Sequence, residues 1–112
     1  MSRPKLLFDD VREICIQMVR GYDRRIFIYE NGLEMAPYDP IAIQAVEEAK
    51  KNIGIELPET VREELVEAIT LSCKMDRHSF RQEEQLAGIS KSEFYNQRNR
   101  FLLNIARYLQ LI

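Results

Sequence analysis

Residues 88–112, with the sequence GISKSEFYNQRNRFLLNIARYLQLI, decide how the C-terminal part of the chain folds. Ser90 stands three residues before Glu93, which is the spacing of a capping box, in which both side chains satisfy backbone N–H groups at a helix start. Ile89 precedes the cap and Phe94 is the fourth residue after it, so their side chains can form a hydrophobic staple. Cap, box and staple therefore predict a helix that starts directly after Ser90.

This helix is predicted to run to about Leu109 and to be amphipathic. At 100° per residue, six apolar side chains gather on one side. They are Phe94, Phe101, Leu102, Ile105, Leu109 and Ile112. We expect that side to face the core of the protein.

The opposite side of the helix carries hydroxyl, amide and guanidinium groups, which can hydrogen-bond to base edges or phosphate oxygens of a duplex. The side chains expected to contact DNA are Lys91, Ser92, Tyr95, Asn96, Asn99 and Arg100. The cations expected to displace counterions from phosphates are Lys91, Arg98, Arg100 and Arg107. The alternative is a merely solvated surface, because asparagine and arginine are common there.

A shorter helix is predicted upstream, at about residues 79–87. Ser79 and Gln82 have the capping-box spacing, and Gly88 opens a three-residue turn to the next cap. A short helix, a turn that starts with glycine and a longer helix match a helix-turn-helix at about residues 79–109. The same geometry also occurs as a plain corner between helices of a bundle.

Three helices are predicted before this motif from apolar side chains at three-to-four spacing. The first extends from about Pro4 to Gly21. The second has Asp39 as its cap and ends at Gly54. The third begins near Pro58. The predicted fold class is therefore all-α, a small bundle of about five helices that forms one domain over residues 1–112 and ends in the helix-turn-helix.

Two details of this region carry further expectations. Thr60 and Glu63 have the spacing of a capping box and are expected to start the third helix. The composition of residues 24–30 suits a short strand, but the apolar spacing continues at helical intervals and no second strand is available, so we favour a helix. Whether Ile26–Tyr29 belongs to the core or to an interface stays open.

Charge is distributed unevenly along the chain. The net charge of the 112 residues is −2, with 16 Lys and Arg against 18 Asp and Glu. Residues 1–70 hold 9 basic and 14 acidic side chains, a balance of −5, and residues 71–112 hold 7 and 4, a balance of +3. An acidic body with a basic C-terminal part suits a protein that meets phosphate through one end, and an ordinary solvated surface is the alternative.

Several classes of function are not expected. Cys15 and Cys73 lie on apolar helical stripes and are expected to be buried free thiols in a reducing cytoplasm. His78 has no partner at motif spacing, and no glycine-rich phosphate loop or serine-nucleophile motif occurs. We therefore expect neither an enzyme nor a metal site, cofactor, small-molecule substrate or membrane span, and we expect the protein in the cytoplasm.

The residues of the C-terminal helix resemble a known family. Gly88–Arg98, followed by Phe101-Leu102 and Ile105-Ala106, is similar to the end of the RinA/ArpU-type phage transcriptional regulators, and Asp39–Ala45 resembles the segment that opens their central helix. The resemblance implies a phage- or prophage-encoded regulator of late or packaging-related genes. It also implies double-stranded DNA as partner and residues 91–109 as recognition helix, with a second copy of the chain or RNA polymerase as further candidate partners.

Two other functions remain open at this stage. The first is a non-enzymatic helical interaction protein that binds or inhibits a partner through its acidic N-terminal part or through Ile26–Tyr29. The second is the small subunit of a phage packaging machine, which would share the DNA-binding helix without the regulatory role. Genomic neighbourhood, in particular a position upstream of terminase genes, would favour the regulator.

Overall fold

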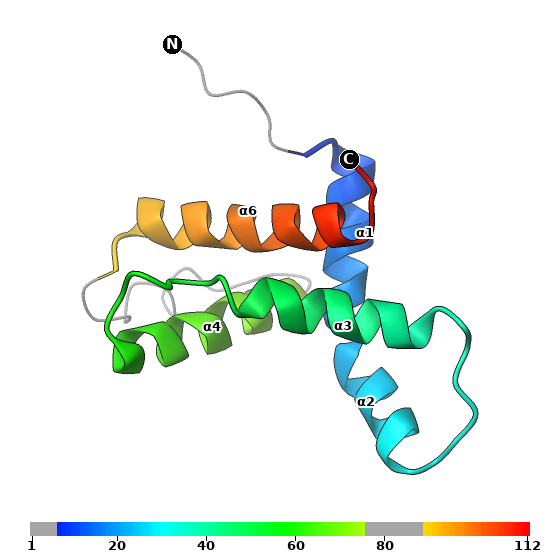
Figure 1. Ribbon diagram of the computed structural model, residues 1–112. Coiled ribbons are helices and arrows are strands. Elements are labelled where there is room, and N and C mark those ends of the chain that lie inside the picture. The colour runs from blue at the N-terminus through cyan, green and yellow to red at the C-terminus, as the bar shows by residue number, and fades with distance from the viewer. Residues whose placement is uncertain (1–6, 76–88) are drawn as a thin grey trace.

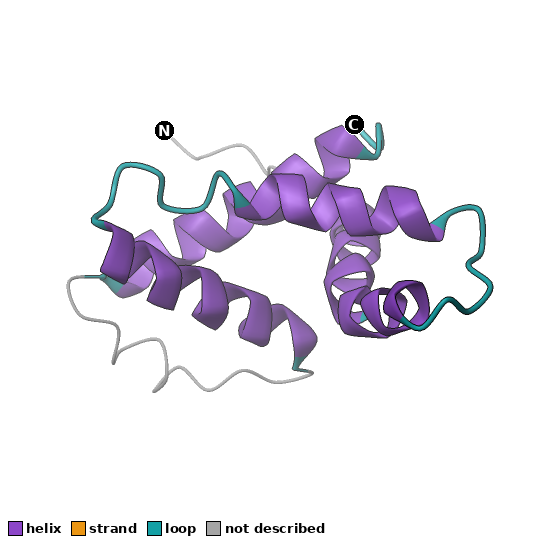
Figure 2. Cartoon of the chain, turned by 60° about the horizontal axis from the view of Figure 1, so that its bottom comes forward, coloured by secondary structure: helices purple, strands orange, loops and turns teal. Residues whose placement is uncertain are grey.

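The computed structural model describes residues 7–75 and 89–112, and in this part of the chain every regular element is a helix (Figures 1 and 2). The helices are α1 (Asp9–Arg20), α2 (Tyr22–Glu30), α3 (Asp39–Lys50), α4 (Glu59–Lys74) and α6 (Lys91–Tyr108). The predicted all-α class is thus confirmed, and the ambiguous segment 24–30 is helical. The first helix of the predicted helix-turn-helix, with its Ser79–Gln82 cap and Gly88, lies outside the described residues.

The long helix α6 lies on three of its neighbours. It packs against α1, α3 and α4, while α2 packs against α3 and the end of α1 on the other side of the molecule (Figure 1). None of the described helices is both long and apolar enough to span a bilayer. The position of α6 at the edge of the bundle leaves one of its faces on the surface.

The core lies where α1, α3, α4 and α6 meet. Its fully buried side chains from α6 are Phe94, Phe101, Leu102, Ile105 and Ala106. On α3 the buried stripe consists of Ala42, Ala45, Val46 and Ala49. The small alanine side chains allow the backbones of α3 and α6 to approach closely, and the aromatic rings of α6 then fill the space towards α4. Of the six apolar residues predicted to face inward, Leu109 is only half-buried and Ile112 is exposed, because α6 ends at Tyr108.

Two predicted helix caps are wrong. Tyr38 is the residue before α3, and Asp39 is the first residue within it. Pro58 likewise precedes α4, which starts at Glu59 without a side-chain cap, so Thr60 is already inside the helix. Proline suits a position at a helix start because it has no N–H that would need an acceptor.

The carboxylate of Asp39 serves a different purpose from capping. It accepts hydrogen bonds from Arg25 Nε at 3.1 Å and from the Ala36 N–H at 3.1 Å. Arg25 and Asp39 are both buried, and their pairing offsets part of the cost of taking the two charges out of water. Gly21 makes room for the pair, since a Cβ there would lie 2.5 Å from Arg25 Nη1. This ion pair joins α2 to the start of α3.

Candidate nucleic-acid interface

The start of α6 has the predicted serine cap and hydrophobic staple, but only half of the predicted capping box, because the Glu93 side chain bonds to Gln97 rather than back to the Ser90 N–H. Ser90 is extended, and its Oγ accepts a hydrogen bond from the Glu93 N–H at 3.0 Å. Ile89 and Phe94 are both buried in the core, as a hydrophobic staple requires. The Glu93 carboxylate accepts a hydrogen bond from Gln97 Nε2 at 2.7 Å, which directs this acid along the helix. The first turn of α6 is therefore held at a defined position and angle.

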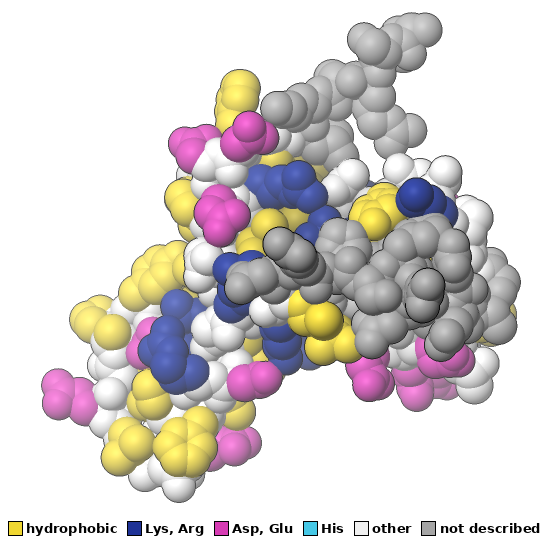
Figure 3. All heavy atoms as spheres, turned by 180° about the vertical axis from the view of Figure 1, so that it is seen from behind, with side chains coloured by type: hydrophobic (Ala, Val, Ile, Leu, Met, Phe, Trp, Pro, Cys, Tyr) yellow, Lys and Arg dark blue, Asp and Glu magenta, His cyan; other side chains and the backbone are white. Residues whose placement is uncertain are grey.

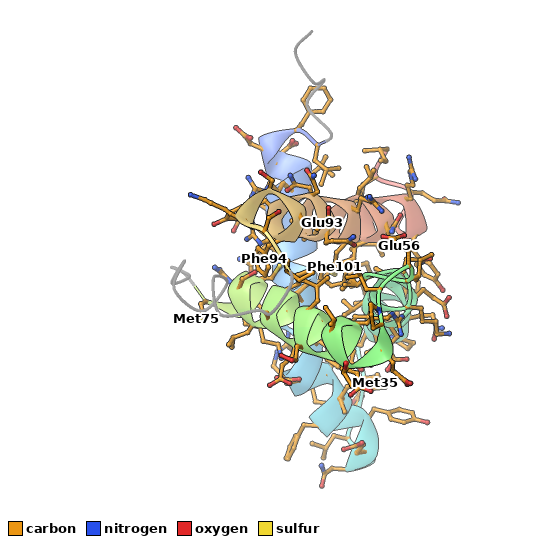
Figure 4. The ribbon with its side chains drawn as sticks, turned by 90° about the vertical axis from the view of Figure 1, so that its left-hand side faces the viewer. Met35, Glu56, Met75, Glu93, Phe94 and Phe101 are labelled. Carbon is orange, nitrogen blue, oxygen red and sulfur yellow. The ribbon has the colours of Figure 1, made fainter. Side chains whose placement is uncertain are left out.

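Gln97 is a buried polar side chain that the sequence did not single out. Its Oε1 accepts a hydrogen bond from the Gly54 N–H at 3.1 Å, while its Nε2 also lies 3.4 Å from Glu56 Oε1. Gly54 has a φ of +58°, in the left-handed region that favours glycine. Gln97 thus connects α6 to the turn between α3 and α4 (Figure 4, where Glu56 and Glu93 are labelled).

Arg98 is also buried, which corrects the prediction that it displaces counterions from phosphates. Its Nε donates to Ser72 Oγ at 3.1 Å, and Ser72 Oγ donates to the Ile69 carbonyl at 2.8 Å. Arg98 lies on the same side of α6 as Phe94 and Phe101, which point from α6 towards α4 in Figure 4. The available signal was the position of Ser72 on the apolar stripe of α4, because a hydroxyl that donates to its own helix can still accept a hydrogen bond from a neighbouring one.

The six predicted DNA contacts divide into two groups by exposure. The exposed ones are Lys91, Ser92 and Arg100, and the half-buried ones are Tyr95, Asn96 and Asn99. Tyr95 packs against the core, and its ring meets that of Phe94 edge to face with the centroids 5.4 Å apart. Ser92, Asn96, Asn99 and Arg100 thus lie on the side of α6 away from the core, whereas Lys91 is exposed only because it is in the first turn and Tyr95 lies against the core.

A stripe of polar side chains runs along the outward side of α6, and we name it the outer stripe. It consists of Ser92, Asn96, Arg100 and Arg107, spaced by four, four and seven residues. Residues at these intervals lie above one another on a helix. Arg100 and Arg107 are exposed, and neither forms an ion pair with a carboxylate in residues 7–75 or 89–112. The outer stripe thus carries two guanidinium groups whose charge no carboxylate in the described part of the chain balances.

The described residues contain no cluster of three or more His, Cys, Asp and Glu side chains that could hold a metal ion. Cys15 and Cys73 are buried free thiols, as predicted. Burial, aided by the neighbouring Cys73, raises the pKa of the Cys15 thiol to about 11, and burial also raises the pKa of Cys73. Both sulfurs are therefore protonated at neutral pH and are poor nucleophiles. His78 lies outside the described residues.

Comparisons of the chain with models of protein families, with curated proteins and with solved structures found no significant match. The resemblance to the RinA/ArpU-type regulators therefore stays a prediction from the sequence.

Proposed function

We propose that the chain is a sequence-specific regulator of transcription, of phage or prophage origin, that binds double-stranded DNA with α6 as recognition helix. The observation that carries this proposal is the outer stripe, in which Arg100 and Arg107 are exposed without a carboxylate partner in the described part of the chain. A helix surface that is merely solvated more often alternates acids with bases. On α6 the one acid of the first turn, Glu93, is engaged with Gln97.

The stripe offers different chemistry at its two ends. In recognition helices the N-terminal residues approach the base edges, and the remainder follows the backbone. Ser92 and Asn96 lie at that end, and an asparagine amide can bond to N6 and N7 of adenine. Arg100 and Arg107 lie one and three turns further along, where guanidinium groups suit phosphate oxygens or guanine. This arrangement assigns base readout to the first two turns and charge neutralisation to the rest.

The inner face of α6 explains how this surface can be held rigidly against a groove. Phe101 fills the core, Gln97 bonds to the Gly54 backbone, and Arg98 bonds to Ser72. Three separate contacts to the body therefore fix both the rotation of α6 about its axis and its position along it. A rigidly held helix loses little conformational entropy when it enters a groove.

A packaging subunit would use the same surface, so DNA binding must be tested before the regulatory role. We would select ligands from a pool of duplexes with a randomised central segment and measure the affinity of the enriched sequence by fluorescence anisotropy. Asn96→Ala with Arg100→Ala should weaken binding by about a hundredfold or more, since each base or phosphate contact contributes about 1–3 kcal/mol. Arg100→Ala alone should leave the thermal midpoint nearly unchanged, because the Arg100 side chain is exposed.

The matched control is Lys51→Ala with Asn52→Ala, which removes one cation and one amide from the exposed turn after α3. We expect this variant to bind like the unmodified protein. If the pool yields no enriched sequence, or if both double variants lose the same affinity, α6 is not the recognition helix. A loss of thermal stability as large as the loss of affinity would show instead that the outer stripe is packed against the protein.

A further inference from the structure

The end of the molecule formed by α2 and the start of α3 exposes a group of large apolar side chains. We name it the α2 surface. Its centre is Phe27, which is 60% exposed on the outward side of α2. Leu33, Tyr38 and Ile41, in the loop after α2 and at the start of α3, are 52%, 43% and 50% exposed, whereas Tyr29, 66% exposed, lies about 200° round the helix from Phe27 and faces another direction. Beside them is a hollow of about 330 Å³, lined among others by Ile26, Met35 and Ile43.

The charges on the outward side of α2 are arranged symmetrically about Phe27. Arg24 precedes it by three residues and Glu30 follows it by three. On a helix these side chains lie about 4.5 Å along the axis on either side of Phe27. Both are exposed, and neither has an ion-pair partner among the residues that the structure describes. The nearby Asp23 is already compensated, because Lys74 Nζ lies 2.8 Å from its Oδ2.

We propose that a second copy of this chain docks on the α2 surface, with the two α2 helices antiparallel across a two-fold axis near Phe27. Such an axis places Phe27 against Phe27 of the second copy and brings each Arg24 level with the opposite Glu30. A two-fold interface requires a surface that is complementary to itself, and an apolar centre between opposite charges at equal distances meets that requirement. Figure 3 shows hydrophobic side chains at this end of the molecule, with basic and acidic ones around them.

The proposal is independent of DNA binding, because the α2 surface and the outer stripe of α6 belong to different helices on different sides of the bundle (Figure 1). The two nevertheless fit together. A dimer through α2 leaves both copies of α6 uncovered, so one assembly would present two recognition helices, the usual arrangement for proteins that bind paired half-sites.

The test is the oligomeric state of the full chain by analytical ultracentrifugation from micromolar to sub-millimolar concentration. We expect a reversible monomer–dimer equilibrium for the unmodified protein. Phe27→Asp should weaken the dimer by about tenfold or more, as for a residue at the centre of an interface. Ile55→Asp is the control, because Ile55 is 61% exposed but lies in the turn between α3 and α4. It should leave the equilibrium unchanged.

Charge reversal tests the orientation of the two helices. Arg24→Glu and Glu30→Arg should each weaken the dimer, and the double variant should restore it, because the reversed charges again face each other. Circular dichroism verifies that every variant is folded. A protein that stays monomeric throughout overturns the proposal and leaves the α2 surface to a different protein. Equal effects of Phe27→Asp and Ile55→Asp, or a double variant no better than the single ones, would also overturn it.

Discussion

Arg98 and Arg100 stand two residues apart in the same helix and have opposite environments. Arg98 is buried and donates to Ser72 Oγ, whereas Arg100 is exposed and has no ion-pair partner among the described residues. The inner face of α6 holds the helix on the bundle, and the outer face lies on the surface of the protein. Whether an arginine of α6 is available to a ligand therefore depends on the face of the helix on which it lies.

The largest effect on stability is expected from the centre of the inner face. Phe101 is fully buried between α6 and α4. Phe101→Ala should lower the free energy of unfolding by about 3–5 kcal/mol, because it removes a buried ring and leaves a cavity. Urea denaturation measures the loss. A decrease below about 1 kcal/mol would mean that α6 is not anchored by this face, and the contrast between the faces would fail.

A smaller loss is expected from the polar part of the same face. Arg98→Ala removes a charge-assisted hydrogen bond to Ser72 and should cost about 1.5–3 kcal/mol. Arg98→Met keeps the apolar stem without the buried charge and should cost less. The affinity of the folded variants for the selected duplex should not change. Weaker DNA binding with unchanged stability would place Arg98 on the ligand side and contradict the assignment of the two faces.

The sequence predicts the helices well and the polar side chains unevenly. The start of α6 could be located because cap and staple use residues adjacent in the chain, and the local hydrogen bond from Glu93 to Ser90 follows directly. The burial of Gln97 and Arg98 depends on Gly54 and Ser72, which are distant in sequence. Helical periodicity shows that a polar residue lies at the margin of an apolar stripe. It does not show whether a neighbouring helix or turn offers that residue a hydrogen-bond partner.

The same limitation explains the error at Asp39. An aspartate before a proline has the local pattern of a cap, and the competing interaction comes from Arg25, fourteen residues earlier on another helix. The members of the outer stripe could be predicted better than the buried polar residues, because it is enough that they lie on the side of the helix away from the apolar stripe. What could not be predicted is which of its cations lack a carboxylate partner, because that depends on the surfaces of neighbouring helices.

A modest loss of stability is expected from a substitution at the N-terminal cap of α6. Ser90→Ala removes the hydrogen bond that Ser90 Oγ accepts from the Glu93 N–H and should lower the free energy of unfolding by about 1 kcal/mol. Ser92→Ala is the matched control, because this exposed serine lies two residues further along and should change stability by less than about 0.5 kcal/mol. Equal losses in thermal denaturation would show that the cap does not hold the start of α6.

The measurement that most directly tests the role of the outer face is the salt dependence of duplex binding for the unmodified protein and for Arg100→Ala with Arg107→Ala. Each phosphate that a cation neutralises contributes about 0.9 to the slope of log affinity against log salt concentration. The double variant should therefore reduce that slope by about 2, with the free energy of unfolding nearly unchanged. Equal slopes for the two proteins would contradict the account, because the exposed arginines of α6 would then not meet the DNA.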